Sequence, residues 1–318
     1  MVAFVVAQKG ERPGEQFQKC WIGEATIIFD LRFQRDFPTR RFQMRIRYGF
    51  DIELTFPQPT TVVTVMDVHP SRKFDVIEES GIHTNQEIRF QRFMDHFGNV
   101  TRRFTADAGV LALKLVGTIA DSGLPDPVNL SADAIDASEL PADVLPFLAA
   151  SRYCETDLLA SFAWSTFGST TGGWAKVQAV CDYVNARLTF SYPNARETRT
   201  AAQAMEERSG VCRDFTHLAV TLCRCLNIPA RFCNGYLGDI GVAPDPSPMD
   251  FNAWFEAYLD GQWYTFDARH NEPRKGRILL SRGRDAADVA MITTFGPHQL
   301  SRFAVTTEEL PENVTLAA

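Results

Sequence analysis

Hydrophobic and polar residues alternate along the chain from Met44 to about residue 118. Apolar residues recur at every second position over residues 44–54, as in a strand with one buried face. Further strands are predicted at residues 60–68, 87–94, 100–106 and 110–119, with no helical pattern between them. This pattern predicts a β-sandwich-like domain over residues 44–120.

The pattern changes after residue 120. Residues 121–145 are rich in Pro, Asp and Ser and predict a linker. Apolar residues then recur every three or four positions, and helices are expected at 142–150, 156–167, 173–188, 199–208 and 212–226. Strands are expected afterwards at 230–237, 251–259, 262–268 and 302–307, with a hairpin turn at Asp260-Gly261. Residues 146–310 are therefore expected to form a second domain, and the whole chain belongs to the α+β class.

Residues 1–43 share neither pattern. A run rich in Arg and Phe extends from residue 32 to residue 47 and overlaps the strand that begins at Met44. One interpretation is a basic arm for nucleic acid or a membrane. The favoured interpretation is an extension without a fold of its own, because the run lacks an amphipathic period. Met44 is a candidate for the natural start, so residues 1–43 are expected to be unstructured or not native.

Composition narrows the classes of partner. With 318 residues and 45% apolar residues, the chain can bury a sizeable core in about two domains. Its net charge of -7 argues against nucleic acid as the main partner. No apolar run approaches the length of a membrane span, and the apolar start lacks the features of a signal peptide. The seven irregularly spaced cysteines fit reduced thiols better than a disulfide framework, so we predict a cytoplasmic protein without membrane partners.

One cysteine has the setting of a nucleophile. Gly210 forms a turn, and Cys212 then lies in the first turn of the predicted helix 212–226. The free amides and the positive end of the helix dipole favour a thiolate at that position. The alternative is a buried structural thiol, since free cysteine is among the most buried residue types.

The motifs around this cysteine resemble those of one family. They are Gly210-Val211-Cys212-Arg213-Asp214-Phe215, Leu226-Asn227-Ile228-Pro229-Ala230-Arg231, Gly235-Tyr236, Ala253-Trp254-Phe255-Glu256 and Trp263-Tyr264-Thr265-Phe266-Asp267. In this order they resemble the transglutaminase-like superfamily over about residues 155–270. The resemblance implies a papain-like core, a Cys-His-Asp triad, and acyl transfer through a thioester to water or to an amine. It also implies a bacterial-type cysteine protease or amidase with a peptide or protein substrate.

The resemblance assigns Cys212 as the nucleophile and Asp267 as the orienting acid. The family's histidine position, directly before Ala253-Trp254, is occupied by Asn252. Asparagine can neither accept a thiol proton nor form the cation that lowers a thiol pKa. A hairpin loop of two or four residues would place Asn252 and Asp267 on the same face of adjacent strands.

Other residues are candidates for the remaining roles. His270 would face away from Asp267 if the strand continued, but in a loop it could fold back as a rescuing base; the favoured alternative is a solvated or structural histidine. His217 is expected to pack within its helix. Tyr192 is a candidate oxyanion donor beside the Cys212 amide, and a packed loop tyrosine is its alternative. We see no acidic loop with calcium-ligand spacing, so no metal or cofactor is predicted.

Three hypotheses follow. The first is a cysteine-dependent hydrolase or acyltransferase acting on peptide or amide bonds through a thioester on Cys212. The second is a catalytically silent protein of the same fold that binds a peptide or a protein partner. In the third, the β domain carries the function through protein contacts, because fold resemblance alone does not fix activity.

Overall fold

The computed structural model of the 318-residue chain describes residues 17–22, 25–30 and 44–311. The chain divides into two units, Met1–Arg41 and Phe42–Ala318. In the first unit, β1 (Phe17–Ile22) and β2 (Ala25–Asp30) pair as antiparallel strands. This differs from the expectation of no fold over residues 1–43, and the β-branched residues within β2 favour a strand. Most of the predicted basic run, residues 32–43, lies outside the described residues.

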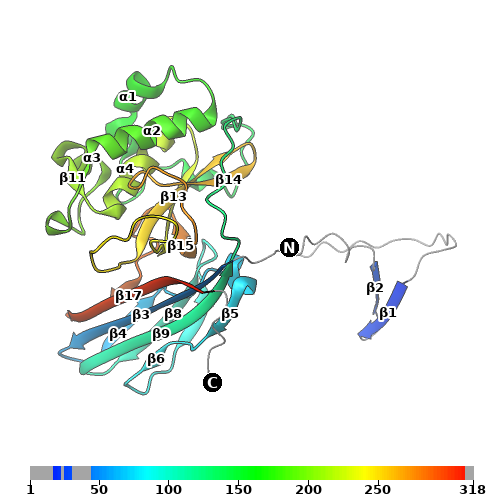
Figure 1. Cartoon of the computed structure of the whole chain (residues 1–318), viewed down its shortest axis with the longest axis vertical. Coiled ribbons are helices and arrows are strands. Elements are labelled where there is room, and N and C mark those ends of the chain that lie inside the picture. The colour runs from blue at the N-terminus through cyan, green and yellow to red at the C-terminus, as the bar shows by residue number, and fades with distance from the viewer. Residues whose placement is uncertain (1–16, 23–24, 31–43, 312–318) are drawn as a thin grey trace. The chain divides into compact units, whose positions relative to one another are not determined.

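The second unit begins with a β-sandwich-like pair of antiparallel sheets (Figure 1). The five-stranded sheet contains β17 (Gln299–Leu310), β3 (Met44–Phe56), β9 (Gly109–Asp121), β5 (Val76–Glu79) and β6 (His83–Thr84). The four-stranded sheet contains β16 (Ile292–Thr294), β4 (Thr60–Thr64), β8 (Val100–Ala106) and β7 (Gln91–Met94). A 3-10 helix, η2 (Pro70–Asp75), follows β4 and precedes β5. The predicted β domain and its fold class are confirmed.

The alternation in β3 decides which side of the sheet is buried. Ile46, Tyr48, Phe50 and Ile52 are buried, whereas Arg47 and Asp51 between them are half-buried and only Gly49 breaks the alternation. They pack with buried leucines of β9 in one apolar cluster, and β3 and β9 pair along their whole length. A shift of one residue would turn the apolar side chains to solvent, so this pattern fixes the register.

The end of the chain returns to the sandwich. β17 pairs with β3, and β16 pairs with β4. The expected domain 146–310 is therefore not continuous in space, because its last strands complete the sheets that residues 44–121 form. Without β17, β3 would be a long edge strand with unpaired backbone groups. The sequence pattern of a strand cannot identify its partner, which explains the difference.

Four α-helices and a further four-stranded sheet form the part that contains Cys212. The helices are α1 (Thr156–Phe167), α2 (Gly173–Arg187), α3 (Ala201–Glu207) and α4 (Cys212–Cys225). The sheet has the order β14 (Gln262–Phe266), β13 (Asn252–Leu259), β12 (Ala230–Tyr236) and β15 (Ile278–Gly283). The helix expected at 142–150 is only the 3-10 helix η3 (Leu145–Phe147), since Pro146 cannot continue an α-helix.

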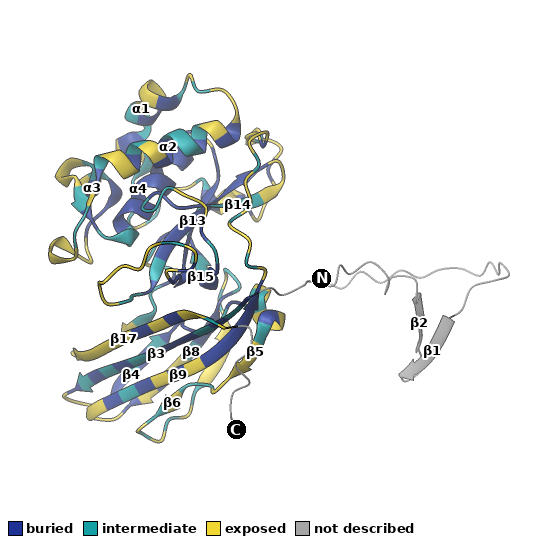
Figure 2. Ribbon diagram, in the orientation of Figure 1, coloured by how far each residue is buried: buried dark blue, intermediate teal, exposed yellow. Residues whose placement is uncertain are grey.

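Helix α4 lies at the centre of this part and contacts α1, α2, α3, β12 and β13. The sequence predicted a single apolar stripe, but nearly every residue of the helix is buried (Figure 2). Its one deeply buried arginine, Arg224, donates hydrogen bonds to the carbonyl oxygens of Ala149, Ala230 and Arg284. These bonds satisfy a charged group that would otherwise be costly to bury.

The predicted hairpin between β13 and β14 is confirmed as a two-residue loop. Leu259 pairs with Gln262, and both Asp260 and Gly261 have positive φ. This is the conformation that an Asp-Gly hairpin turn requires. β15 was not predicted, because its neighbourhood is rich in arginine rather than in alternating apolar residues.

The two halves of the second unit share one apolar core. Tyr236, Phe251 and Ile278 belong to the part with Cys212, yet they pack in the same cluster as Ile46 and Leu113 of the sandwich. Removal of residues 44–118 would expose these side chains. Such a deletion therefore cannot isolate a function of the β domain. Within the described part of the chain, no helix is long and apolar enough to cross a membrane.

We expect Leu218→Ala to lower the free energy of unfolding by about 2–5 kcal/mol, because Leu218 is completely buried in α4. Leu158 in α1 is 62% exposed, and Leu158→Ala is expected to change stability by no more than about 0.5 kcal/mol. Urea denaturation followed by circular dichroism measures both. Equal losses in the two variants would contradict the central position of α4.

Candidate active site

The chain enters helix α4 through a short parallel bridge. β11 (Ser209–Gly210) pairs with β10 (Thr189–Phe190), and the 3-10 helix η4 (Tyr192–Asn194) follows β10. Gly210 lies so close to Asp214 that a Cβ atom would come within 2.5 Å of the Asp214 Cβ. The turn that the sequence predicted at this glycine therefore also serves close packing. It delivers Cys212 to the first position of the helix.

Asp214 holds this helix start in place. Its Oδ2 accepts a hydrogen bond from the Val211 N–H at 2.9 Å and forms an ion pair with Arg199 Nη1 at 3.1 Å. The Asp214 side chain is completely buried, and Arg199 also pairs with Glu207. Because Arg199 balances this carboxylate, the negative charge near Cys212 is partly neutralised inside the fold.

Cys212 is half-buried. Burial raises the pKa of its thiol to about 11, and the Arg269 guanidinium opposes this rise. The carboxylate of Asp250 adds to the rise. The expected thiolate-favouring effect of the helix start does not dominate, since loss of hydration penalises the charged form more strongly.

Asn252 is the first residue of β13, and its amide is engaged on both sides. Its Oδ1 accepts a hydrogen bond from Arg269 Nη1 at 3.1 Å. Its Nδ2 donates to the carbonyl oxygens of Leu237 at 3.4 Å and Asp250 at 3.3 Å. The position that the family resemblance gives to a base therefore holds a side chain that orients an arginine.

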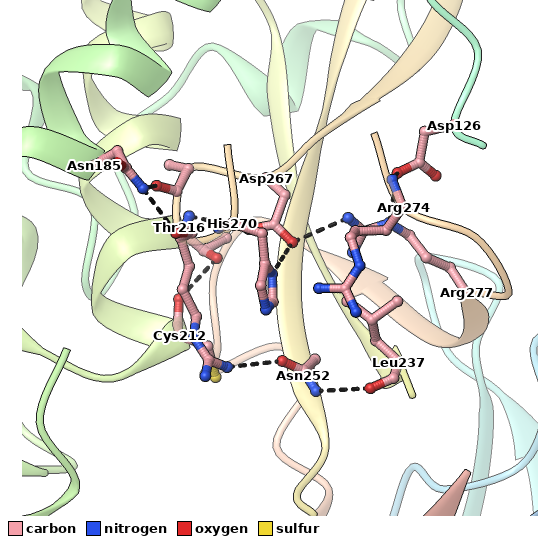
Figure 3. Close-up of polar contacts among 12 residues, drawn as sticks. Asp126, Asn185, Cys212, Thr216, Leu237, Asn252, Asp267, His270, Arg274 and Arg277 are labelled. Carbon is pink, nitrogen blue, oxygen red and sulfur yellow. Dashed lines mark hydrogen bonds and ion pairs between the residues drawn. The ribbon is translucent and has the colours of Figure 1, made fainter. Parts of the chain in front are cut away.

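Asn252 and Asp267 lie on the same face of the sheet, as the hairpin predicted. The last pair is Phe255 with Phe266, and extending this register by one residue places Asp267 opposite Trp254, a same-face neighbour of Asn252. Figure 3 shows Cys212, Asn252, Asp267 and His270 in one region. Cys212 comes from α4, and the other three come from β13 and the turn after β14.

Asp267 is buried and accepts four hydrogen bonds. Its Oδ1 accepts from the backbone N–H groups of Arg269 and His270, each at 3.0 Å. Its Oδ2 accepts from His270 Nδ1 at 2.9 Å and from Arg277 Nη2 at 3.0 Å. Burial alone would raise the pKa of this carboxyl, but the Arg277 charge and the His270 contacts lower the pKa well below its usual range.

His270 reaches Asp267 because the chain leaves the strand after residue 266. The Asn271 N–H donates to the Asp267 carbonyl at 2.8 Å, and Asn271 has a φ of 53°. This is a single helical turn, in which residues three apart lie on one side. From α2, Asn185 Nδ2 donates to the carbonyl oxygens of Ala268 and Arg269 and fixes the turn. The fold-back alternative for His270 is the observed one.

The Asp267 contact sets the tautomer of His270. An ionised carboxylate can only accept a hydrogen bond, so His270 Nδ1 carries the proton in this contact. In the neutral ring, Nε2 then holds a free lone pair. A carboxylate that holds an imidazole in this tautomer is the arrangement a general base requires.

The other two candidates differ in their surroundings. His217 is buried, and its Nε2 accepts a hydrogen bond from the Ala286 N–H at 3.1 Å. Its ring stacks on Tyr153, so the expected packing role agrees with the structure. Tyr192 is 43% exposed and close enough to Cys212 to interact electrostatically. Burial raises the pKa of its hydroxyl, which therefore stays a donor.

Sequence reasoning missed three residues that shape the site: Arg269, Arg277 and Asn185. The first two lie in the Arg-rich segment 269–284, and that unusual density was the available signal. Asn185 lies in a helix and has no distinguishing spacing. No group of three or more metal-binding side chains is arranged to hold a metal ion in residues 44–311.

Comparisons with known proteins find a matching family and similar structures. A family model described as the transglutaminase-like superfamily matches residues 161–268. An uncharacterized protein of Mycobacterium leprae is 28% identical over 117 residues, which cover 36% of this chain and 42% of that protein. The match thus spans less than half of that relative's length.

One solved structure extends the similarity beyond residues 161–268. A crystal structure of a "putative cysteine protease" from Cytophaga hutchinsonii has 28% sequence identity and a TM-score of 0.72. The match covers 86% of this chain and 92% of that one. The periplasmic domain of TgpA from Pseudomonas aeruginosa, bound to ethylmercury, covers 70% of this chain and 90% of its own, with 13% identity and a TM-score of 0.36. The family model confirms the predicted family over residues 161–268, and the Cytophaga hutchinsonii structure confirms the fold class.

We expect Asp267→Asn to lower the free energy of unfolding by about 3 kcal/mol or more at pH 7, because it breaks a buried ion pair with Arg277. The native pKa of Asp267 lies below that of an unfolded carboxyl, about 3.9. The ionised group therefore stabilises the fold above that pH, and this contribution is lost as the pH falls below about 5. Urea unfolding of both proteins between pH 7 and pH 3 should show a shrinking difference. A difference independent of pH would contradict the assignment.

Proposed function

Residues 161–268 match the transglutaminase-like superfamily, and on this premise we propose that the protein is a cysteine-dependent hydrolase or acyltransferase. It acts on peptide or amide bonds through a thioester on Cys212. His270 is the general base, Asp267 orients it, and Asn252 has an indirect role. The observation that carries the proposal is the 2.9 Å contact between His270 Nδ1 and the buried Asp267 carboxylate.

The His270 pair supplies what Asn252 cannot. The Asn252 amide has no basic nitrogen, and its oxygen is already bonded to Arg269. His270 has a free lone pair on Nε2, and it is half-buried rather than solvated. The imidazole therefore comes from the turn after β14 instead of from the start of β13.

The reaction begins with transfer of the Cys212 thiol proton to His270 Nε2. The thiolate attacks the carbonyl carbon of the scissile amide, and the imidazolium then gives its proton to the departing amine. This leaves a thioester on Cys212. Water or a second amine attacks the thioester with His270 again as base, which regenerates the thiol. Proton transfer requires that Cys212 Sγ and His270 Nε2 lie within hydrogen-bond distance. Substrate binding often shortens such a contact between catalytic groups.

Two donors support stabilisation of the oxyanion. The Cys212 N–H is at the first position of α4 and has no acceptor within the helix. Tyr192 provides a hydroxyl, and within the described residues that hydroxyl makes no hydrogen bond. The partial positive charge of the helix start adds to this stabilisation.

A second candidate function is supported by the pKa of Cys212. A thiol with a pKa of about 11 is almost fully protonated at pH 7, and Asn252 occupies the position of the family's base. Both features fit a catalytically silent protein that binds a peptide or a protein partner. The two candidates differ in one respect: only the enzyme depends on His270 for reactivity of Cys212 with an amide substrate.

We expect His270→Gln to reduce kcat/KM for peptide cleavage by about 10²–10⁴-fold, because general-base catalysis contributes that much. The measurement is cleavage of a pool of internally quenched fluorescent peptides. The control is His83→Gln, since His83 is an exposed histidine of β6. Equal activity of the wild type and His270→Gln would contradict the role of His270. Absence of cleavage by both, with a folded wild type, would favour the silent protein.

A second prediction concerns the pH dependence of Cys212 alkylation by iodoacetamide. In Asn252→His, an imidazole at the family position should lower the apparent pKa of Cys212 from about 11 toward the range of about 3–7 seen for thiols paired with imidazolium. Alkylation at pH 7 should then be faster than in the wild type. An unchanged pH profile would show that residue 252 does not face the thiol.

A further inference from the structure

Arg269 is the cation that most strongly stabilises a Cys212 thiolate. Among the groups that affect the pKa of Cys212, its guanidinium has the largest lowering effect. The side chain is half-buried, and the guanidinium carbon lies 3.8 Å from the centre of the Phe190 ring. Its Nη1 bonds to Asn252, and the next residue, Ala253, belongs to the apolar cluster against which Cys212 packs. Arg269 is therefore a fixed charge beside the nucleophile rather than a freely moving surface arginine.

Three contacts fix this residue. The Arg269 N–H donates to Asp267 Oδ1, and its carbonyl accepts from Asn185 Nδ2 at 2.7 Å. Nη1 donates to Asn252 Oδ1 at 3.1 Å. Asn252 thus holds the guanidinium by a neutral oxygen, which leaves the charge of Arg269 uncompensated at this contact.

Arg269 forms no ion pair within the described residues. Arg199, Arg231, Arg277 and Arg284 each lie within 4.0 Å of a carboxylate oxygen. Burial raises the pKa of Asp250, and the nearby Arg269 charge opposes that rise. The Asp250 Oδ1, however, accepts a hydrogen bond from the Phe251 N–H. A half-buried guanidinium with an unused charge and free N–H donors is suited to a carboxylate, whose two oxygens match its donors.

We propose that Arg269 is a specificity-determining residue that binds a carboxylate of the substrate next to the scissile amide. This inference rests on the proposed role of Cys212 as the nucleophile, and it names the substrate class: peptides with a negative charge at the reacting end. The charge comes from an Asp or Glu side chain or from a terminal carboxylate. Asn252 and Phe190 position the guanidinium.

The position of Arg269 links binding to reactivity. A substrate carboxylate bound to Arg269 brings the adjacent carbonyl toward Cys212. A chemical reason explains why Asn252 occupies the family's histidine position. A histidine cation there would repel the Arg269 guanidinium, whereas the neutral Asn252 amide oxygen accepts a hydrogen bond from it. Arg269 and His270 are consecutive, so the single turn that Asp267 holds presents both.

The test compares two alkylating agents of similar size, anionic iodoacetate and neutral iodoacetamide. A change in the thiolate fraction affects both rates equally, so the ratio of the iodoacetate rate to the iodoacetamide rate reports binding of the carboxylate alone. Trypsin releases Cys212 in the peptide 209–213, and mass spectrometry of that peptide separates it from the other cysteines. N-acetylcysteine amide gives the reference ratio.

We expect the ratio for Cys212 to exceed the reference, and Arg269→Gln to lower it by about fivefold or more, as loss of a charge pair does. Arg269→Lys keeps the charge and should retain part of the preference. Arg302→Gln is the matched control, because Arg302 lies in β17 of the sandwich, and its ratio should equal that of the wild type. A wild-type ratio that Arg269→Gln leaves unchanged would overturn the carboxylate site while Cys212 remains the nucleophile. Failure of both reagents to modify Cys212 up to pH 10 would instead overturn the nucleophile and the site that depends on it.

Peptide substrates then separate the two sources of the charge. Matched peptides carry Glu or Gln near the scissile bond, each with a free or an amidated C-terminus. Preference for Glu in both terminal forms identifies an acidic side chain, and preference for the free terminus in both side-chain forms identifies a terminal carboxylate. In either case Arg269→Gln should abolish the preference chiefly through KM. Equal cleavage of all four peptides by the wild type would contradict the proposal.

Discussion

The buried carboxylate of Asp267 organises the candidate site. It accepts hydrogen bonds from two backbone N–H groups, from His270 and from Arg277. Arg277 is in turn held by Asp126 of the segment between the two halves of the second unit, at 2.9 Å. One ionised group therefore connects the end of β14, the following turn, the approach to β15 and the linker. An unpaired charge at this depth would be costly, so its partners are fixed along with it.

The turn after β14 carries both side chains to which we assign a role in the reaction, His270 and Arg269. His270 faces the Asp267 carboxylate, and Arg269 extends toward Asn252 and the ring of Phe190. In the proposed reaction the imidazole has moved from the first residue of β13 to this turn. The first residue of β13, Asn252, instead accepts a hydrogen bond from the Arg269 guanidinium. The change that removes a base from the family position is thus accompanied by a nearby cation, Arg269, and by an imidazole from the turn, His270.

The nucleophile depends on a separate set of contacts. Asp214 caps the start of α4 and pairs with Arg199, while Gly210 leaves room for that carboxylate. The helix is buried on all sides, so Cys212 is held by the core of the domain rather than by a surface loop. That rigidity comes with loss of hydration, which raises the thiol pKa to about 11. A nearby positive charge is the main compensation, and Arg269 supplies it.

The sequence by itself determined the longer strands of the sandwich, the helix that begins at Cys212, the Asp-Gly hairpin and the face shared by Asn252 and Asp267. These features follow from the spacing of apolar residues and from turn residues, which depend only on positions close together in the sequence. Only the tertiary structure decided that β16 and β17 return to the sandwich, that α4 is surrounded, and that His270 and Arg277 meet on Asp267. Those outcomes depend on partners distant in sequence or on a break in strand geometry after residue 266, and no period along the chain encodes either one.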